Sequence, residues 1–236
     1  MPRDYLKYTL FNLKSLKTKN SLITTELPKL DDLLGGGLKK GIITDIYGPS
    51  GIGKTQFALQ FSIYSILNGD QVLFQDTSGN FRPERIHEIL KNRGNEIQLM
   101  NNVKVLRLTN TIEQIQSLRK IYTGFSLIVI DNISDLFIYE YSKSEKFFEM
   151  NLLFAKYLHS LSLLALERKI PIIITNMVKN FEGQEIESLE KTINLFCHTK
   201  IRLIKQGRKL IARVLSPYKS GEFYYQVRSE GISQAN

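Results

Sequence analysis

Most of the chain alternates between short apolar runs and longer amphipathic stretches. Residues 126–131, SLIVID, form a continuous apolar run, which is typical of a strand covered on both faces of a sheet. Residues 82–94, RPERIHEILKNRG, carry apolar side chains at helical spacing and end at a glycine. This alternation predicts an α/β fold with a mainly parallel, doubly wound sheet flanked by helices. The expected strands cover residues 41–47, 71–76, 103–108, 126–131 and 170–175, and the expected helices cover 55–67, 82–94, 111–122 and roughly 143–168.

The pattern changes after residue 198. The segments TKIRLIK and LIARVLS flank the turn-like QGRK and alternate as the two strands of a hairpin do, and EFYYQVR adds another strand. We therefore expect a C-terminal antiparallel hairpin that extends one edge of the sheet. The chain has no low-complexity linker and no internal repeat of about 20–50 residues. We expect a short basic N-terminal arm, residues 1–20, followed by one core domain, residues 21–236.

The charge balance indicates the kind of partner. The net charge is +9 over 236 residues, which favours a polyanion such as nucleic acid or nucleotide, although such a charge also serves solubility. No run of about 18 apolar residues occurs, so no membrane span is expected. The N-terminus lacks the features of a signal peptide, so we expect a cytoplasmic, nucleoid-associated protein. The single cysteine, Cys197, is expected to be a small buried residue, and the three histidines, His87, His159 and His198, have no metal-ligand spacing.

A glycine-rich loop lies between the first apolar strand and the helix that follows it. Its glycines let backbone N–H groups wrap a phosphate, and the helix directs its positive N-terminal end at the same place. A lysine supplies positive charge near the terminal phosphates, and a threonine hydroxyl is placed to ligate Mg²⁺. The sequence therefore predicts a phosphate and Mg²⁺ site at Gly48, Pro49, Ser50, Gly51, Ile52, Gly53, Lys54 and Thr55.

A site of this kind also needs an acid at the end of a buried strand. Asp131 ends the run SLIVID, and its expected role is to hold a water on the Mg²⁺. The alternative role is a helix cap after the strand. Because the phosphate loop is already present, we favour the metal role. We expect Lys54 and Asp131 to be the catalytic groups, with Thr55 and Asp131 beside the metal.

Four stretches in a fixed order carry a family resemblance. They are LPKLDDLLGGGLKKGIITDIYGPSGIGKTQ (27–56), FRPERI (81–86), IPIIITNMV (170–178) and ARVLSPYKSGE (212–222). Together they resemble the RecA-type recombinases, and in particular the archaeal RadA and RadB group. The resemblance implies a RecA-like phosphate-loop NTPase core with ATP and Mg²⁺ as cofactors. It also implies that Arg85 stacks on the adenine, which suits a flat guanidinium; the alternative for Arg85 is a solvated helix face.

The resemblance implies partners as well. These are single- or double-stranded DNA, a main RadA-type recombinase or other repair proteins, and a homo-oligomer. The chain has no room for the separate helical DNA-binding domain of RadA recombinases, and residues 1–20 show no clear Phe-x-x-Ala polymerisation motif. A core-only architecture is similar to RadB and related recombinase paralogues. This favours an accessory protein over the main strand-exchange recombinase.

Two positions depart from the recombinase pattern. Where the family has Asp-Thr-Glu, this chain has Asp76, Thr77 and Ser78, so the glutamate that orients the attacking water is missing. Where the family strand ends in Thr-Asn-Gln, this chain has Met177, which lacks the amide that senses the terminal phosphate. Losing one such group commonly lowers the rate by about two to four decades. We expect tight ATP–Mg²⁺ binding with slow or negligible hydrolysis, and Asp76 is a candidate substitute for the glutamate.

Basic residues indicate where DNA would bind. The family's first DNA loop corresponds to residues 137–148, where aromatic residues alternate with lysines, and its second loop corresponds to residues 179–191, which carry four glutamates. Aromatic side chains beside lysines can stack bases and hold the backbone, although such residues more often pack in a core or an interface. We expect modest, salt-sensitive and sequence-independent binding; the alternative for the hairpin is a solvated edge strand. The candidate DNA contacts are Lys143, Lys146, Lys200, Arg202, Lys205, Arg208 and Lys209.

Three functions remain open from the sequence. The leading hypothesis is an ATP- and DNA-binding recombinase paralogue in DNA repair and homologous recombination, which mediates or regulates the main recombinase. The second is an active DNA-dependent ATPase that forms its own filament. The third is a nucleotide-gated protein-interaction module without a DNA role.

Overall fold

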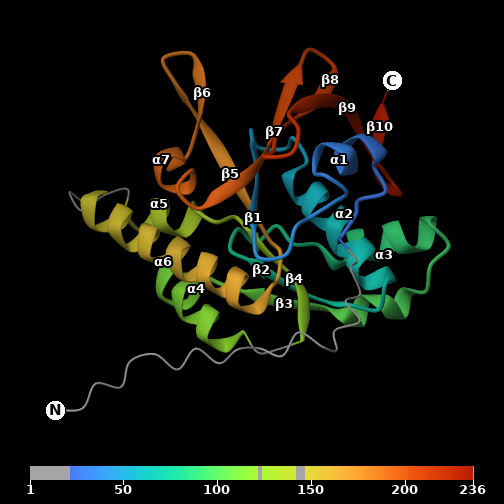
Figure 1. Cartoon of the computed structure of the whole chain (residues 1–236), viewed down its shortest axis with the longest axis horizontal. Helices are drawn as coiled ribbons and strands as arrows, with labels where there is room; N and C mark the ends of the chain where they lie inside the picture. The colour runs from blue at the N-terminus through green and yellow to red at the C-terminus, as the bar shows by residue number, and fades with distance from the viewer. Residues whose placement is uncertain (1–21, 122–123, 142–146, 236) are drawn as a thin grey trace.

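The computed structural model describes residues 22–121, 124–141 and 147–235 (Figure 1). Ten strands form one sheet in the order β10-β9-β8-β7-β1-β5-β4-β2-β3, and β6 pairs with β5 beside this path. The strands are β1 (Ile43–Gly48), β2 (Gln71–Asp76), β3 (Val103–Arg107), β4 (Phe125–Asp131), β5 (Ile172–Phe181), β6 (Gln184–Glu187), β7 (Cys197–Gln206), β8 (Lys209–Leu215), β9 (Gly221–Arg228) and β10 (Gly231–Ala235).

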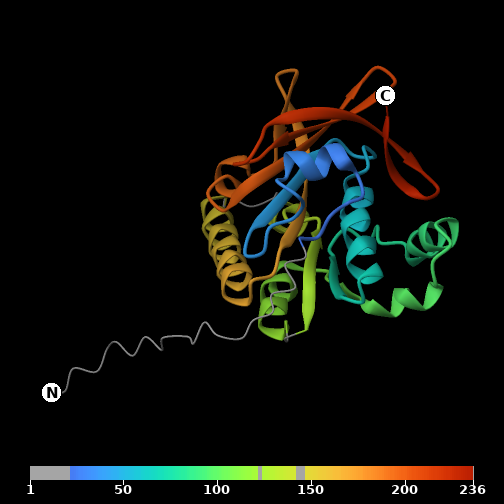
Figure 2. The same ribbon diagram turned by 45° about the vertical axis from the view of Figure 1, so that its right-hand side comes forward.

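Helices cover both faces of this sheet. Figures 1 and 2 show α2 and α3 on one side of the strands and α6 on the other. The helices are α1 (Pro28–Leu33), α2 (Lys54–Leu67), α3 (Pro83–Asn92), α4 (Thr111–Ser117), α5 (Asp135–Tyr141), α6 (Phe147–Arg168) and α7 (Glu190–Ile193), with 3₁₀ turns at Ile97–Asn102 and Leu118–Lys120.

The side chains of β4 explain its unbroken apolar sequence. Leu127 and Val129 join the core beneath α2 and α3, whereas Ile128 and Ile130 join the core beneath α6. Successive side chains of a strand point to opposite faces, so a strand covered on both faces must be apolar throughout. The predicted α/β fold with a mainly parallel sheet and C-terminal antiparallel strands is confirmed.

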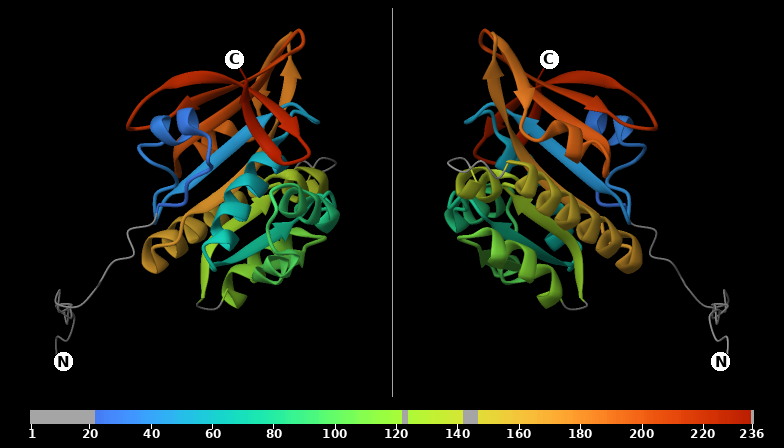
Figure 3. Two further views of the ribbon diagram at one scale, coloured as in Figure 1. Left: turned by 90° about the vertical axis from the view of Figure 1, so that its right-hand side faces the viewer. Right: turned by 90° about the vertical axis from the view of Figure 1, so that its left-hand side faces the viewer.

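The C-terminal strands form the end of the sheet opposite β3 (Figure 3). Strand β7 pairs in parallel with β1 on one side and antiparallel with β8 on the other, so it joins the two parts of the sheet. The extension also contains β10, which the sequence pattern did not predict. Strand β9 packs on α1 and β10 packs on α2, and Tyr225 and Val227 of β9 lie beside Gly53 of the phosphate loop.

Three elements differ from their predicted bounds by more than two residues. Strand β5 runs to Phe181, beyond the predicted end at residue 175, because its last residues pair with β6. The predicted helix 111–122 is α4 followed by a 3₁₀ turn, and the predicted stretch 143–168 contains α6 from Phe147.

Residues 1–20 and 142–146, which hold the expected N-terminal arm and the lysines Lys143 and Lys146, lie outside the described residues. Within the described part of the chain, no helix combines the length and apolar character needed to cross a membrane.

The carboxyl edge of the parallel strands gathers the polar candidates. In the register of the sheet, Gly48 at the end of β1 lies beside Met177 of β5, and Asp76 at the end of β2 lies beside Asp131 of β4. Loops at this edge of an open α/β sheet are the usual place for a ligand. The fold therefore brings the phosphate loop and the candidate acids to one place.

Candidate nucleotide-binding site

The phosphate loop connects β1 to α2. Gly53 directly precedes α2 and has φ of 106°, a conformation that residues with a side chain rarely adopt. A Cβ atom at Gly48 would lie 2.5 Å from the carbonyl oxygen of Leu203 in β7, so this position also excludes a side chain. In the described structure no side chain caps the first turn of α2. Its backbone N–H groups are therefore left for an anion.

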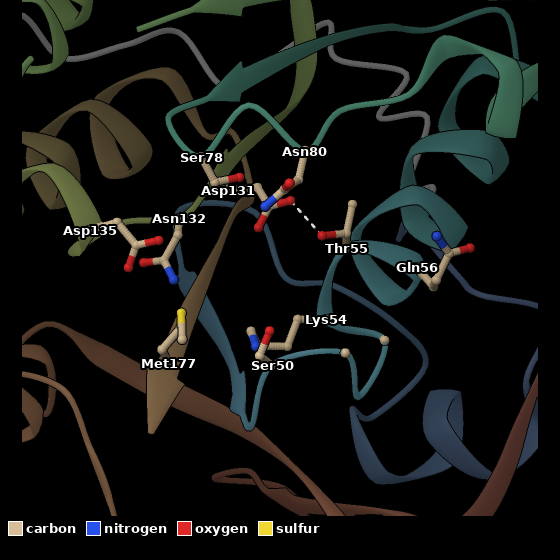
Figure 4. A pocket seen from close by; sticks show the side chains of 12 residues that line it. Ser50, Lys54, Thr55, Gln56, Ser78, Asn80, Asp131, Asn132, Asp135 and Met177 are labelled. Carbon is tan, nitrogen blue, oxygen red and sulfur yellow. Dashed lines mark hydrogen bonds between the residues drawn. The ribbon is translucent and has the colours of Figure 1, made fainter. Parts of the chain in front are cut away.

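The loop forms one wall of a pocket of about 420 Å³ (Figure 4). Figure 4 shows that side chains from α2, from the end of β4, from the middle of β5, from the segment after β2 and from the start of α5 converge on this pocket. Its volume is in the range of small-ligand sites, about 300–1,000 Å³. The side chains on which its chemistry depends are Lys54, Thr55, Ser78, Asp131, Asp135 and Met177.

Lys54 lies over the loop. Its ammonium donates to the carbonyl oxygens of Gly48 and Pro49 at 3.0 and 2.8 Å. Burial lowers the pKa of Lys54, and the carboxylates of Asp131 and Asp135 oppose that effect. A phosphate oxygen in the pocket is a stronger partner for an ammonium than a neutral carbonyl. Lys54 is therefore placed to bind a phosphate group.

Thr55 and Asp131 form a ready pair of oxygen ligands. The Thr55 hydroxyl donates to Asp131 Oδ2 at 2.6 Å, and the Thr175 hydroxyl donates to the other carboxylate oxygen. Burial raises the pKa of Asp131 despite these two hydrogen bonds. A divalent cation would offset that cost, and Mg²⁺ prefers hydroxyl, carboxylate and phosphate oxygens. The residues present therefore fit Mg²⁺ held between this pair and a nucleotide phosphate.

The two departures from the recombinase pattern both lie at this pocket. Ser78 and Met177 line it, and neither side chain carries a charge at neutral pH. The Ser78 hydroxyl turns towards Asp76 Oδ1, at 3.3 Å. The pocket therefore has no carboxylate at the position of the family glutamate and no amide at the position of the family glutamine.

Asp76, the predicted substitute for the glutamate, is fully engaged elsewhere. Its Oδ1 accepts hydrogen bonds from the backbone N–H groups of Gly79 and Asn80, at 2.8 and 3.2 Å. Its Oδ2 pairs with Arg107 at 2.7 Å. Asp76 is not among the residues that line the pocket, so the geometry contradicts its role as the substitute. Its carboxylate instead holds the turn that follows β2.

A second acid in the pocket was missed from the sequence. Asp135 is the first residue of α5 and lines the pocket together with Asp131 and Met177. Burial raises the pKa of Asp135, the neighbouring Asp131 raises it further, and Lys54 opposes both effects. The only available signal was an acid four residues after a strand-ending acid, which also fits an ordinary helix start.

A family model described as Rad51 matches residues 17–235. The chain belongs to the Rad51 family. The RecA-type resemblance inferred from the sequence is therefore confirmed, and RecA-family recombinases generally bind ATP with Mg²⁺.

Among the individual relatives that resemble this chain are RadB and RadA proteins of archaea. The DNA repair and recombination protein RadB of Thermococcus gammatolerans is 29% identical over 228 residues, which cover 91% of this chain and 100% of the relative. The protein of the same name from Thermococcus sibiricus is 31% identical over 223 residues, covering 89% and 94%. The DNA repair and recombination protein RadA of Aeropyrum pernix is 32% identical over 244 residues, covering 95% and 76%.

Arg85, the predicted adenine contact of this Rad51-family chain, lies beside the pocket. Its Nε donates to Gln56 at 2.8 Å, and its other nitrogens donate to the carbonyl oxygens of Arg228 and Ser229 in the turn between β9 and β10. It also pairs with Glu88. These contacts link α3 to the C-terminal strands, and stacking on adenine stays a prediction.

Lys200 was predicted to contact DNA, but its side chain is largely buried. Its ammonium lies 3.4 Å from Asp45 Oδ2 in β1 and forms an ion pair with Glu187 at the end of β6. Its side chain is 12% exposed, and the two carboxylates are almost fully buried. The prediction that Lys200 contacts DNA is wrong, because the ammonium neutralises two buried acids. Arg202 is half-buried, and its nearest acid is Glu185 at 3.6 Å.

The predicted second DNA loop, residues 179–191, is a hairpin and a short helix. Strands β5 and β6 pair from Val178 with Glu187 to Phe181 with Gln184, and α7 follows. The sequence pattern predicted neither this hairpin nor α7. Among the remaining candidate contacts in the described structure, the exposed ones are grouped at the turn between β7 and β8: Lys205, Arg208 and Lys209.

Proposed function

We propose that this chain is an ATP- and DNA-binding recombinase paralogue that assists or regulates a main recombinase in DNA repair and recombination, with slow hydrolysis of ATP. The repair role follows from membership of the Rad51 family and from the names of the RadB and RadA relatives. One observation supports the nucleotide part of the proposal. The binding groups Lys54, Thr55 and Asp131 are in place, whereas Ser78 and Met177 occupy the positions that assist hydrolysis in the family.

The chain's own residues explain how the site would hold its ligand. The free N–H groups at the start of α2 and the Lys54 ammonium would bind phosphate oxygens, and Thr55 with Asp131 would hold Mg²⁺. Bound Mg²⁺ would neutralise phosphate charge. Gln56 lines the pocket and accepts a hydrogen bond from Arg85, the predicted adenine contact.

Isothermal titration calorimetry with Mg-ATP tests binding, and phosphate release tests hydrolysis. We expect clear heat of binding and turnover two to four decades below a rate of about 1 s⁻¹, which is within the normal range for enzymes. Absence of heat would refute the nucleotide site. Turnover of about 1 s⁻¹ would refute the assignment of slow hydrolysis.

The DNA part of the proposal depends on the exposed basic turn between β7 and β8. Its side chains project from the end of the antiparallel extension, where a phosphate backbone can approach without displacing the core. Lengths of assemblies on single-stranded DNA separate a regulator from a filament-forming recombinase. Short complexes or single subunits support the regulator, and long continuous filaments with rapid turnover support the alternative.

A further inference from the structure

Asp135 lies where two pockets meet. The phosphate pocket and an adjoining, mainly apolar pocket of about 610 Å³ share four lining residues, which are Ser78, Asn80, Asp135 and Met177. In Figure 4 the Asp135 carboxylate lies on the side of the pocket where Asn132 and Met177 also lie. Asp135 is therefore beside the two positions where this chain departs from the family pattern.

The turn between β4 and α5 fixes the position of Asp135. The backbone N–H of Ser134 donates to Asn132 Oδ1 at 2.9 Å, and the Ser134 hydroxyl donates to Asn176 Oδ1 at 2.6 Å. The Ile138 N–H donates to the Ser134 carbonyl at 2.9 Å and starts the helix. These contacts hold the start of α5 against the end of β4 and the middle of β5. The location of the carboxylate is thus set by two buried strands.

The Asp135 carboxylate is available for a ligand. In the part of the chain that the structure describes, no hydrogen-bond donor is recorded for it, whereas Asp76 and Asp131 both accept several hydrogen bonds. Charges of Lys54, Asp131 and Lys179 act on it, which places it within the electrostatic reach of the phosphate loop. An acid at a helix start also stabilises the helix slightly, so the experiment must separate that role from a catalytic one.

We propose that Asp135 orients the water that attacks the terminal phosphate of ATP, and so carries the slow hydrolysis that remains after loss of the family glutamate. This inference depends on the proposed nucleotide site. Asp135 accepts a hydrogen bond from the water, whose oxygen bonds to the terminal phosphorus. The bond from that phosphorus to the bridging oxygen breaks, ADP leaves with the electron pair, and one water proton passes to solvent. The products are ADP and inorganic phosphate.

The test compares three single variants and one double variant. Asp135→Asn removes the charge and keeps the shape, and Glu84→Gln removes a matched acid from the first turn of α3, outside the pocket. Ser78→Glu restores the family carboxylate alone, and the double variant combines Ser78→Glu with Asp135→Asn. Each protein is measured for phosphate release, for affinity for Mg-ATP and Mg-ADP, and for melting temperature.

We expect Asp135→Asn to lower phosphate release by about 100-fold or more. Its affinity for Mg-ATP relative to Mg-ADP should rise by about fourfold, which one unit charge produces at about 5 Å even in the dielectric constant of water. Glu84→Gln should leave both quantities unchanged. The double variant should release phosphate faster than Asp135→Asn, because Ser78→Glu supplies another carboxylate.

Three outcomes overturn the inference. The first is nucleotide binding with no detectable turnover in the wild-type protein. The second is an Asp135→Asn variant whose turnover and ATP-to-ADP preference both equal those of the wild type. A variant that merely loses helix stability would melt earlier and bind both nucleotides more weakly, which also contradicts the inference. Failure of every protein to bind nucleotide refutes the proposed function instead.

Discussion

Replacing Lys200 with methionine tests whether its charge serves the core or the DNA. Lys200 in β7 lies directly beside Asp45 of β1, and its ammonium also contacts Glu187 and Asn194. Both oxygens of Asp45 lack a hydrogen-bond partner in the described structure, so the ammonium is their main compensation. Lys200→Met keeps the aliphatic stem and leaves two buried carboxylates without their shared cation.

The expected loss of stability is large. Removing one member of a buried ion pair costs about 3–5 kcal/mol, because the remaining charge is left without compensation. For a chain of this size each kcal/mol lowers the melting temperature by about 2–4 °C, so the decrease should be about 6–20 °C. Lys205→Met is the matched control, since Lys205 lies on the same strand and is exposed. Its effect should stay within about 0.5 kcal/mol.

The pH dependence gives a second measurement. Burial, with a further contribution from Glu187, raises the pKa of Asp45 well above its ordinary value, and Lys200 opposes this shift. A carboxyl group with a raised folded pKa stabilises the protein fully below its unfolded pKa, and this contribution is lost as the pH rises through the folded pKa. The cost of Lys200→Met should therefore be larger at a higher pH, such as about 8, than at a lower pH, such as about 5, because the charged form of Asp45 gains weight as the pH rises.

Urea unfolding at the two pH values measures both effects. A loss below about 1 kcal/mol would show that the ammonium does not compensate the buried acids, and an equal loss at both pH values would show that the titration of Asp45 does not contribute to it. A Lys200→Met protein of unchanged stability with weakened DNA binding would restore the surface role that the structure contradicts.

The remaining predictions concern the nucleotide pocket and the basic turn. Asp131→Asn should abolish the Mg²⁺ dependence of ATP binding, so titrations with and without EDTA should give the same affinity; a persisting Mg²⁺ effect contradicts the metal role. Tyr225→Phe removes the hydroxyl that donates to the Ile52 carbonyl of the phosphate loop at 2.7 Å, and should lower the free energy of unfolding by about 0.5–1.5 kcal/mol in urea; no loss would show that the contact is not stabilising. Replacing the three basic residues of the turn together with neutral ones should weaken DNA binding uniformly across DNA sequences; these residues are Lys205, Arg208 and Lys209. The slope of log affinity against log salt should fall by about two to three, and an unchanged slope would exclude these contacts.

Local features of the chain made much of the fold predictable. The structures of the apolar strand β4 and of the glycine-rich loop before α2 depend mainly on residues that are close together in the sequence. Both were therefore predicted from the sequence. The ends of parallel strands meet at one edge, so the proximity of Thr55 and Asp131 followed from the predicted topology. These features depend on backbone geometry more than on the identity of distant side chains.

The errors concern side chains whose surroundings come from distant segments. Strand alternation placed Lys200 and Arg202 correctly on one face of β7, but it could not show that β1 and β6 place acids against that face. The family resemblance assigned residues 179–191 to a DNA loop, and the hairpin of β5 and β6 there, with Gly183 at its tight turn, was not predicted. Asp135 faces the pocket because of hydrogen bonds among Asn132, Ser134 and Asn176, which no spacing in the sequence reveals.

Three acids near the phosphate loop have three different environments, and this difference bears on the missing glutamate. Asp76 is held by backbone donors and Arg107, Asp131 by two hydroxyl groups, and Asp135 has only charge interactions in the described structure. A glutamate added at Ser78 would share the pocket with Asp131 and Asp135, and like charges there repel one another. Ser78→Glu alone should therefore orient water and weaken ATP binding at the same time. Because Asp135→Asn relieves that repulsion, the gain in turnover from Ser78→Glu should be larger in the Asp135→Asn background than in the wild type, and equal gains would show that the two positions act independently.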